Sequence, residues 1–501
     1  MGSAPTARLR SSESVDRWFP WAFAAAVSLV FFVVSWLRAY TLEAGFDIAY
    51  FKQAAWQLSH GQGGFLSVRG VHLFADHAYF VMYPIGWLSR LVPVTPLLLG
   101  LQAAGLGFAA VPLYRICRGM AALPPAASAL VLAVYALHPA IENANIFEFH
   151  PETVTAPVAV LGAVWFGHRN RWVACAICVA VLLLTREDYV FVVAGLALVQ
   201  LLGGRRRPAV AMLAAAAVWF VVVGALMARF PGATEIRATR LAPYGTSAVG
   251  AAAFLGRHPR LLWHQLTRPE NFDLLIALLG PVLFLPLLAP VWLLPAAGLE
   301  LVYMLSNIAP AHTIGFQYTL VPGVAVVLAA AVALGRLRAG WGPPSTGPGR
   351  PPDRTLLVPL LAAALLFSLH GSSMSALQHP WQWAGRDAVD RARLAAADVP
   401  TPDASVAASA SILPLVAARR SAYFFPAPFA AYAAQLHPPD PVPLAERIAS
   451  VRYLLIDTTT IPTELHAAMI PDVLHQLEAE GTFEKLWNDH GVEVWRRAPS
   501  S

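Results

Sequence analysis

The sequence predicts a polytopic α-helical membrane protein. Of its 501 residues, 57% are hydrophobic and only 13% are charged, whereas about 25% of the residues in an ordinary soluble domain are charged. The hydrophobic residues gather in blocks of about 15 to 22 residues, and a helix of that length crosses a bilayer core of about 30 Å. The first block, Ala22 to Leu37, is uncharged and apolar on both faces. We therefore expect helices and not the alternating strands of a membrane barrel.

The apolar blocks indicate about eleven membrane-spanning helices within residues 21–371. Three arginines within residues 1–20 precede the first block, as in a signal peptide, but this block is too long and has no small-residue cleavage site. We therefore expect an uncleaved first helix behind a short cytoplasmic tail. The expected spans are 21–40, 94–116, 123–141, 153–168, 172–185, 188–203, 208–228, 273–288, 290–306, 316–335 and 355–371.

The positions of the arginines predict the orientation of the chain. With the N-terminus in the cytoplasm, the short connections on that side are arginine-rich, in agreement with the positive-inside rule. An odd number of spans then places the C-terminus outside. The arginines concerned are Arg115, Arg118, Arg169, Arg171, Arg205, Arg206, Arg207, Arg336, Arg338, Arg350 and Arg354.

Two outer loops and a C-terminal domain complete the predicted organisation. The outer loops are residues 41–93 and 229–272, and in the first of them the amphipathic stretch 78–92, interrupted by Pro84, should lie on the outer leaflet without crossing it. The Pro- and Gly-rich residues 339–353 should form a disordered cytoplasmic linker. Charges then return, so we predict a small extracytoplasmic α/β domain over residues 372–501. Its elements should be strands at 405–410, 453–457, 483–487 and 492–495, a helix at 464–480, and a tight turn at 489–491.

The composition also excludes some classes of function. The net charge is +6, but nucleic-acid binding is not expected of a chain that is mostly membrane helix. Lysine occurs only at Lys52 and Lys485, and neither follows a glycine-rich loop. There is thus no phosphate-binding loop for ATP-driven transport. Cys175 and Cys178 have the spacing of a metal or redox pair, but we interpret them as small residues of a buried helix.

The first outer loop contains the strongest candidate for a catalytic carboxylate. Asp47 lies a few residues beyond the first span, at the start of a stretch that fits a helix lying on the membrane. A carboxylate at this interface could act as a general base, because partial burial raises its pKa toward neutrality. The alternative is that Asp47 only caps the helix. His60 and His77, beside Asp76, are further candidates in this loop for binding substrate.

The second outer segment places three carboxylates and a histidine between two spans, at Glu142, Glu148, His150 and Glu152. Such a group could hold a divalent cation or orient a hydroxyl of a substrate. Because the spacing matches no strict metal signature, a solvated polar loop is an equally good interpretation.

Three consecutive charged residues, Arg186, Glu187 and Asp188, stand between two short apolar blocks. Charges in this position are costly in hydrocarbon unless they reach water, pair or line a cavity. A buried site is the interpretation that we favour over a simple outer turn.

The segment 229–272 is rich in arginine, including Arg237 and Arg240, although we place it outside the membrane. The planar guanidinium group binds phosphate well, so this segment is a candidate for binding a lipid phosphate, with a charged surface loop as the alternative. His312 at the outer start of the tenth span could form a wall of the same site.

Four strings carry a family resemblance: FDIAYFKQAAWQLSHGQ, VHLFADHAYFVMYPIGWL, FEFHPET and LTREDYVF. Together they resemble the bacterial membrane-protein family of domain of unknown function 2079, which looks like a branch of the GT-C glycosyltransferase superfamily. The resemblance implies an integral enzyme of the bacterial cytoplasmic membrane that takes a sugar from a polyprenyl-phosphate donor at the outer face. It also implies an acidic general base in the first outer loop, which by position is Asp47. Many branches have a paired acidic motif there, whereas Asp47 is followed by Ile48.

The leading hypothesis is therefore an inverting GT-C-type glycosyltransferase with an envelope glycan, lipid or protein as acceptor. Asp47 would deprotonate the acceptor, Arg186 or an arginine of 229–268 would hold the phosphate, and Glu187 or Asp188 would orient sugar hydroxyls or a divalent cation. The C-terminal domain would bind the acceptor or cover the site. The alternatives are a transporter or lipid flippase and a non-catalytic envelope scaffold or sensor.

Overall fold

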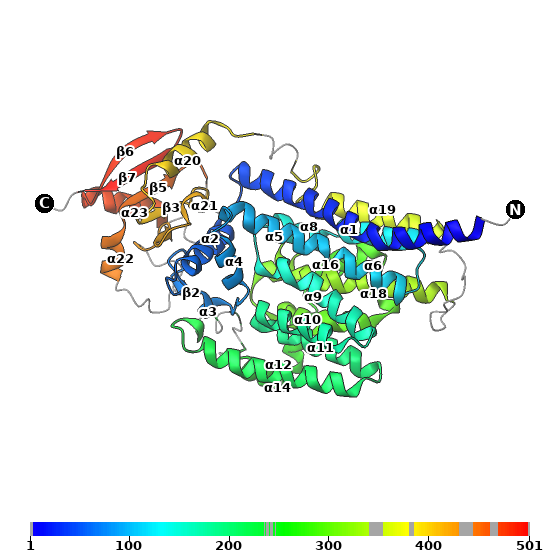
Figure 1. Cartoon of the computed structure of the whole chain (residues 1–501). Coiled ribbons are helices and arrows are strands. Elements are labelled where there is room, and N and C mark those ends of the chain that lie inside the picture. Colours follow the sequence, from blue (N-terminus) through cyan, green and yellow to red (C-terminus); the bar gives the residue numbers. More distant parts are fainter. Residues whose placement is uncertain are drawn as a thin grey trace.

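The computed structural model has a long helical bundle with a small α/β domain at the end opposite the N-terminus (Figure 1). The predicted domain boundaries, at residues 20 and 371, stay predictions. The described residues are 4–234, 236, 240, 244–245, 247–339, 354–379, 385–429, 444–460 and 469–498. The predicted disordered linker therefore lies, apart from Ala339, outside the described residues.

The first helix, α1 (Ala4–Tyr40), packs lengthwise on the predicted second span. That span consists of α5 (Val94–Phe108) and α6 (Ala110–Gly119), which are separated at Ala109. The two helices approach closely because Gly107 has no side chain: a Cβ there would lie 2.2 Å from Ser28 Oγ and 2.8 Å from the Ala24 carbonyl oxygen. Small residues at such crossings are typical of helix packing in membranes.

The predicted third span is bent rather than straight. It consists of α7 (Pro125–Ala136) and α8 (Pro139–Ile146), which meet at 45°. Pro139 cannot continue the hydrogen-bond ladder of the preceding helix, so the bend lies where the sequence demands it. The four helices that follow agree with predicted spans and are α9 (Pro151–His168), α10 (Trp172–Thr185), α11 (Val190–Leu202) and α12 (Arg206–Met227).

The prediction of a continuous span over 273–288 is wrong. The helix α16 (Pro269–Leu279) ends early, and short 3₁₀ turns follow it. Pro281 and Pro286 interrupt the ladder, and Leu283 and Phe284 adopt left-handed conformations with φ of 52° and 56°. The turns and the next helix are η2 (Gly280–Val282), η3 (Leu285–Leu288), η4 (Pro290–Leu293) and α17 (Leu294–Leu305).

The helix α18 (Leu320–Arg338) forms the centre of the bundle. Buried residues extend along its whole apolar length, from Leu320 to Gly335. A helix that is apolar all round requires such surroundings. The short turns η5 (Ala309–His312) and η6 (Gln317–Thr319) precede α18, and α19 (Arg354–Gly371) follows it.

The number of membrane spans stays a prediction. Within the described residues, four helices are long and apolar enough to cross a membrane, or five if the bent pair α7 and α8 is one span. Three further apolar helices are shorter, at Trp172–Thr185, Pro290–Leu305 and Leu356–Gly371. The chain is thus a membrane protein with several apolar helices, and the expected count of about eleven is not confirmed.

The two predicted outer loops contain short helices and one small hairpin. In the first loop, α4 contains Pro84 and is only seven residues long, so it cannot cross the bilayer, as we expected. In the second loop, residues 229–272, the structure contains the helices α14 and α15. The elements are α2 (Phe46–Ser59), β1 (Phe65–Leu66), β2 (Val71–His72), α3 (Leu73–Asp76), α4 (Met82–Leu88), α14 (Ala248–Arg257) and α15 (Pro259–Leu266).

The C-terminal domain is a five-stranded mixed sheet with strand order β4-β3-β5-β7-β6. The pairs β3/β4 and β3/β5 are parallel, whereas β5/β7 and β6/β7 are antiparallel. His490 and Gly491 have positive φ, which is required by the tight turn predicted there. Strand β4 and helix α20 were not predicted. The elements are α20 (Ala388–Asp398), β3 (Val406–Ala408), α21 (Leu413–Val416), β4 (Ala422–Phe424), α22 (Leu444–Ser450), β5 (Tyr453–Asp457), α23 (Met469–Ala479), β6 (Phe483–Asp489) and β7 (Val492–Arg497).

The C-terminal domain packs directly on α2. Apolar residues of both parts share one buried cluster, which includes Phe51 of α2 and Phe424 of β4. Ser67 Oγ donates to the Ala422 carbonyl oxygen over 2.8 Å and accepts from the Ala422 N–H over 2.9 Å. Gln53 Nε2 donates to the same hydroxyl over 2.8 Å. The domain is therefore joined to the helix that carries Asp47.

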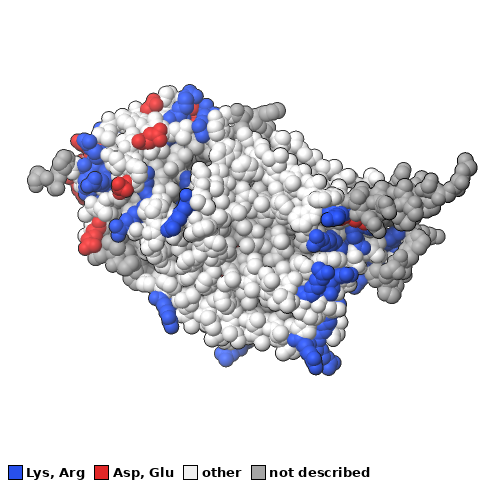
Figure 2. Space-filling view, viewed as in Figure 1, with Lys and Arg blue, Asp and Glu red and all other residues white. Residues whose placement is uncertain are grey.

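Charged side chains gather at the two ends of the molecule (Figure 2). Basic groups dominate at the end of the bundle where the N-terminus lies, both signs cover the C-terminal domain, and the surface between them on this face is mostly uncharged, with isolated basic groups at its lower edge. An uncharged band between two charged ends is what a bilayer requires.

Candidate active site

Asp47 lies in the first turn of α2, but another carboxylate caps this helix. Glu148 Oε1 accepts a hydrogen bond from the Gly45 N–H over 2.8 Å, and its Oε2 accepts one from the Ile48 N–H over 2.6 Å. Because Glu148 satisfies these N–H groups from a distant part of the chain, Asp47 is not needed as the cap.

Asp47 faces a buried histidine. Its Oδ2 lies 3.7 Å from Nε2 of His150, the residue that precedes α9, and its side chain keeps 31% of its accessible surface whereas that of His150 keeps 4%. Asp47 is thus a partly exposed carboxylate, and the imidazole of His150 lies on its buried side.

Arg186 is the centre of a buried ionic network where α10 ends. Its Nη1 donates to Glu152 Oε1 over 2.7 Å, and its Nε lies 3.2 Å from Asp188 Oδ2. Its Nη2 lies 3.4 Å from His77 Nε2. Arg186 is only 5% exposed, which agrees with a buried site and rules out a simple outer turn.

Glu187 belongs to the same network through His77. Glu187 Oε1 lies 2.7 Å from His77 Nδ1, and Glu187 Oε2 accepts the Ala78 N–H over 2.9 Å. Through these contacts the first outer loop is attached to the short turn η1 (Glu187–Tyr189) between two bundle helices.

A second arginine cluster adjoins His77. Asp76 Oδ2 lies 3.0 Å from Arg69 Nε, and Asp76 Oδ1 accepts from Arg240 Nη2 over 2.6 Å. Arg240 comes from the segment 229–272, which thus contacts the first outer loop at Asp76. Arg237 lies outside the described residues.

Tyrosines surround the network and bond to its carboxylates. Tyr79 donates its hydroxyl to Glu152 Oε1 over 3.2 Å, and Tyr303 of α17 donates to Asp188 Oδ2 over the same distance. The Arg186 guanidinium carbon lies 6.0 Å from the ring centroids of both Tyr303 and Tyr318. Aromatic rings of this kind are suited to bind the apolar faces of a sugar.

Two carboxylate oxygens of the network have no hydrogen-bond partner among the described residues. They are Glu152 Oε2 and Asp188 Oδ1, and both are buried. A buried acceptor without a donor is costly, so hydroxyl groups of water or of a ligand are needed there.

The electrostatic surroundings give these carboxylates different pKa values. Burial, together with the nearby Asp47 charge, raises the pKa of Glu148 to about 7, although Arg38 and two N–H groups oppose this. The pKa of Glu187 is lowered to about 2, because His77 more than offsets burial. Burial raises the pKa of Asp188 even though Arg186 lies beside it. Groups with such opposed shifts are typical of functional sites.

Asp76 is held in its ionised form. Burial alone would raise its pKa, but the neighbouring guanidinium groups of Arg69 and Arg240 hold the pKa of this carboxyl well below its usual range. Asp76 therefore neutralises part of the arginine charge at all ordinary pH values.

Some predicted site residues lie elsewhere. His60 follows the C-terminal end of α2, stacked on Trp56, and the 14 residues of that helix separate it from Asp47 by about 20 Å. His312 is buried and lies 2.8 Å from Asn271 Oδ1 and 3.0 Å from the Ser306 carbonyl oxygen, a structural role. The second outer segment is not a solvated loop, because Glu142 is buried in α8 and accepts from Ser368 Oγ.

The carboxylates of the second outer segment do not converge on one point. Glu142 bonds to Ser368, Glu148 bonds to the start of α2, and Glu152 bonds to Arg186. Across the part of the chain that the structure describes, no group of three or more His, Cys, Asp or Glu side chains is arranged to hold a metal ion.

Sequence reasoning missed Arg38, Arg69, Tyr79 and Tyr303. Arg38 Nη1 donates to the Ile146 and Phe147 carbonyl oxygens, and Arg38 lines a cavity of about 130 Å³ beside the site. The signal for Arg69 was its position in the same short loop as Asp76. Tyr303 gave no signal, because an aromatic residue in an apolar helix is indistinguishable from core, and Tyr79 lies among other aromatic residues in the segment between α3 and α4.

Comparisons with known proteins agree with this architecture. Residues 38–483 match the family of predicted membrane proteins DUF2079. No curated protein matches the sequence. Among solved structures, apo ArnT from Cupriavidus metallidurans is similar with a TM-score of 0.52 and 16% identity over 96% of this chain and 99% of that one.

The same ArnT bound to undecaprenyl phosphate is similar with a TM-score of 0.51 and 16% identity, over 96% of this chain and 98% of that one. At this identity the likeness concerns the fold. The chain therefore belongs to the DUF2079 family of predicted membrane proteins, and its fold is similar to that of ArnT, a GT-C glycosyltransferase.

Proposed function

We propose that this protein is an inverting glycosyltransferase that takes a sugar from a polyprenyl-phosphate donor at the outer face of the bacterial cytoplasmic membrane. The observation that carries the proposal is the position of Asp47, a partly exposed carboxylate 3.7 Å from a buried histidine. Its neighbour His150 stands two residues before Glu152, which pairs with Arg186, and Glu152 and Asp188 each have a buried oxygen with no donor among the described residues. The fold similarity to ArnT, which binds undecaprenyl phosphate, supports the choice of donor lipid.

The reaction assigns one role to Asp47. Its carboxylate takes the proton of the acceptor hydroxyl, and the oxygen attacks the anomeric carbon of the sugar. The bond between that carbon and the phosphate oxygen breaks, and the electron pair leaves with polyprenyl phosphate. His150 positions Asp47, and because burial lowers the pKa of this imidazole, it does so in its neutral form.

Arginines supply the positive charge that the leaving phosphate requires. Arg240 and Arg69 lie at the outer loop, where each is partly exposed, at 25% and 18% of its side-chain surface. Arg186 is fully enclosed by its carboxylates, so it organises the site more than it contacts phosphate. We therefore assign the phosphate to Arg240 and Arg69.

The carboxylates around Arg186 suit the sugar. Glu152 Oε2 and Asp188 Oδ1 accept no hydrogen bond from the described residues, and sugar hydroxyls are donors of the right kind. The C-terminal domain covers the far side of α2, where it can bind the acceptor and hold Asp47 in place.

Native mass spectrometry of the lipids retained after purification from bacterial membranes tests the proposal. Asp47→Asn should retain a polyprenyl phosphate that carries a sugar, because the donor binds but does not react. Wild type should retain the unglycosylated polyprenyl phosphate. Glu43→Gln, an exposed carboxylate of the same loop, is the matched control and should resemble wild type. Ordinary phospholipids alone in all three proteins would contradict the proposal and favour a scaffold or a transporter of another substrate.

A further inference from the structure

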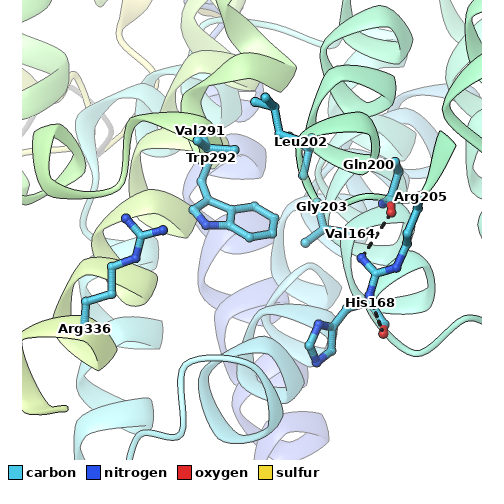
Figure 3. A pocket seen from close by; sticks show the side chains of 10 residues that line it. Val164, His168, Gln200, Leu202, Gly203, Arg205, Val291, Trp292 and Arg336 are labelled. Atoms are coloured by element: carbon cyan, nitrogen blue, oxygen red, sulfur yellow. Dashed lines mark hydrogen bonds between the residues drawn. The ribbon is translucent and has the colours of Figure 1, made fainter. Parts of the chain in front are cut away.

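A second cavity lies at the other end of the bundle from Asp47. It has a volume of about 260 Å³ and lies where α9, α11 and α18 end, beside η4 (Figure 3). Helix α9 begins next to the candidate active site and has 18 residues, so its far end is about 27 Å away. This distance is close to the thickness of a bilayer core. The cavity therefore lies at the opposite membrane face, among the basic groups seen in Figure 2.

The polar groups of this cavity are cationic or neutral. His168, Arg205 and Arg336 line it together with Gln200. None of the lining residues that the structure describes carries a carboxylate. The positive charge of the two arginines is thus not neutralised within the cavity.

The two guanidinium groups keep donors for a ligand. Arg205 donates to Gln200 Oε1 over 3.3 Å and to the His168 carbonyl oxygen over 3.4 Å, both of them long. Arg336 donates one hydrogen bond of 2.9 Å, to the Leu288 carbonyl oxygen. A guanidinium group has five N–H donors, and carbonyl oxygens do not cancel its charge. Two phosphate-binding groups therefore remain on opposite sides of Trp292 (Figure 3).

The rest of the cavity wall is apolar and continues to the outer surface of the bundle. Val164, Val199 and Val291 line it, and Leu202 at its edge is 65% exposed. Trp292 lies between the two arginines (Figure 3), and tryptophan favours the boundary between headgroups and hydrocarbon. Cationic groups beside a lipid-facing apolar edge suit a lipid headgroup better than a soluble anion.

We propose that this cavity binds the headgroup of an anionic phospholipid of the cytoplasmic leaflet. The phosphate would contact Arg205, with His168 as a further donor, Arg336 would contact headgroup oxygens on the other side of Trp292, and the acyl chains would leave past Leu202. The exposed Arg206 and Arg207 lie outside the cavity and would attract anionic lipid without binding it specifically.

Native mass spectrometry of delipidated protein titrated with phosphatidylglycerol or phosphatidylcholine tests this inference. Wild type should bind one phosphatidylglycerol at least about tenfold more tightly than phosphatidylcholine. The double variant Arg205→Gln/Arg336→Gln should lose this preference. The matched control Arg206→Gln/Arg207→Gln removes the same charge at the same face and should stay within about twofold of wild type.

Three outcomes would overturn the inference. If wild type binds phosphatidylglycerol and phosphatidylcholine equally well, the cavity is not such a site. If the control variant Arg206→Gln/Arg207→Gln loses the preference as much as the double variant does, the attraction is a diffuse one to the whole membrane face. Displacement of phosphatidylglycerol by millimolar inorganic phosphate indicates a site for a soluble anion. A second measurement does not depend on the arginine variants: brominated phosphatidylglycerol should quench a component of tryptophan fluorescence that is absent in Trp292→Phe. Equal quenching in both proteins would also overturn the inference.

Discussion

At the scale of single residues, the fold gives the two candidate carboxylates Asp47 and Glu148 different surroundings. Asp47 and Glu148 both lie in predicted outer segments and both were candidates for the site. In the fold, Glu148 bonds to two N–H groups at the start of α2, whereas Asp47 faces His150 and the surface. Of the two, Asp47 is the partly exposed carboxylate, and for this reason we propose it as the base.

Glu148 should make the stability of the protein depend on pH. Its pKa is raised from 4.5 to about 7 in the folded state, so the folded protein holds this proton more tightly than the unfolded chain. The resulting stability is fully present below about pH 4.5 and is lost as the pH rises through about 7. The melting temperature of wild type in detergent should therefore fall from pH 5 to pH 8 by more than that of Glu148→Gln.

The control for this experiment is Glu43→Gln, which removes an exposed carboxyl group of the same segment. Its melting temperature should depend on pH as that of wild type does. Parallel curves for wild type and Glu148→Gln would show that Glu148 is ionised in both states and would contradict the assignment.

At the scale of elements, buried ion pairs hold the ends of the bundle helices together around the site. Arg186 follows α10 and bonds to Glu152 at the start of α9, while Asp188 in η1 accepts from Tyr303 of α17. The guanidinium group of Arg186 thus links the end of α10 to the start of α9 and to η1. Sequence spacing revealed the charges but not their partners, because the partners come from other helices.

Replacing Arg186 with Gln should strongly destabilise the protein. It leaves Glu152 and Asp188 buried without their cation, and the loss of one partner of a buried pair costs about 3–5 kcal/mol. The matched control is Arg496→Gln, whose pair with Glu484 is exposed, at 51% and 46%, so its loss should change the stability much less than the loss of Arg186. Thermal unfolding of both variants in the same detergent makes the comparison. Equal small losses would show that the Arg186 network is not a structural centre of the site.

The sequence predicted most elements of the membrane region, because apolar length and helix formation are both local properties. The predicted helix boundaries were wrong where proline interrupts an apolar block. Pro281 and Pro286 divide an apolar block into turns, and Pro139 bends another. In the C-terminal domain, the three-residue strand β4 was not predicted.

At the scale of the whole molecule, the fold places two different environments at the two ends of one bundle. At one end the C-terminal domain lies on α2 and next to Asp47, and at the other end arginines surround an apolar cavity. Asp47, Arg186 and Arg240 were recognised as candidates because charged residues between apolar blocks are conspicuous, and their roles stay predictions. The structure gives His60 and His312 other surroundings, because the direction in which a polar side chain points depends on tertiary packing.

The central claim is that Asp47 is the base of a sugar transfer from a polyprenyl phosphate. The most direct test is turnover: purified protein is incubated with the lipid extract of its source membranes plus an envelope fraction, and the polyprenyl-phosphate sugars are followed by mass spectrometry. Wild type should consume one such species and release polyprenyl phosphate, and Asp47→Asn should be slower by about 10²–10⁴-fold. Consumption at the same rate by both proteins, or by neither, would contradict the claim.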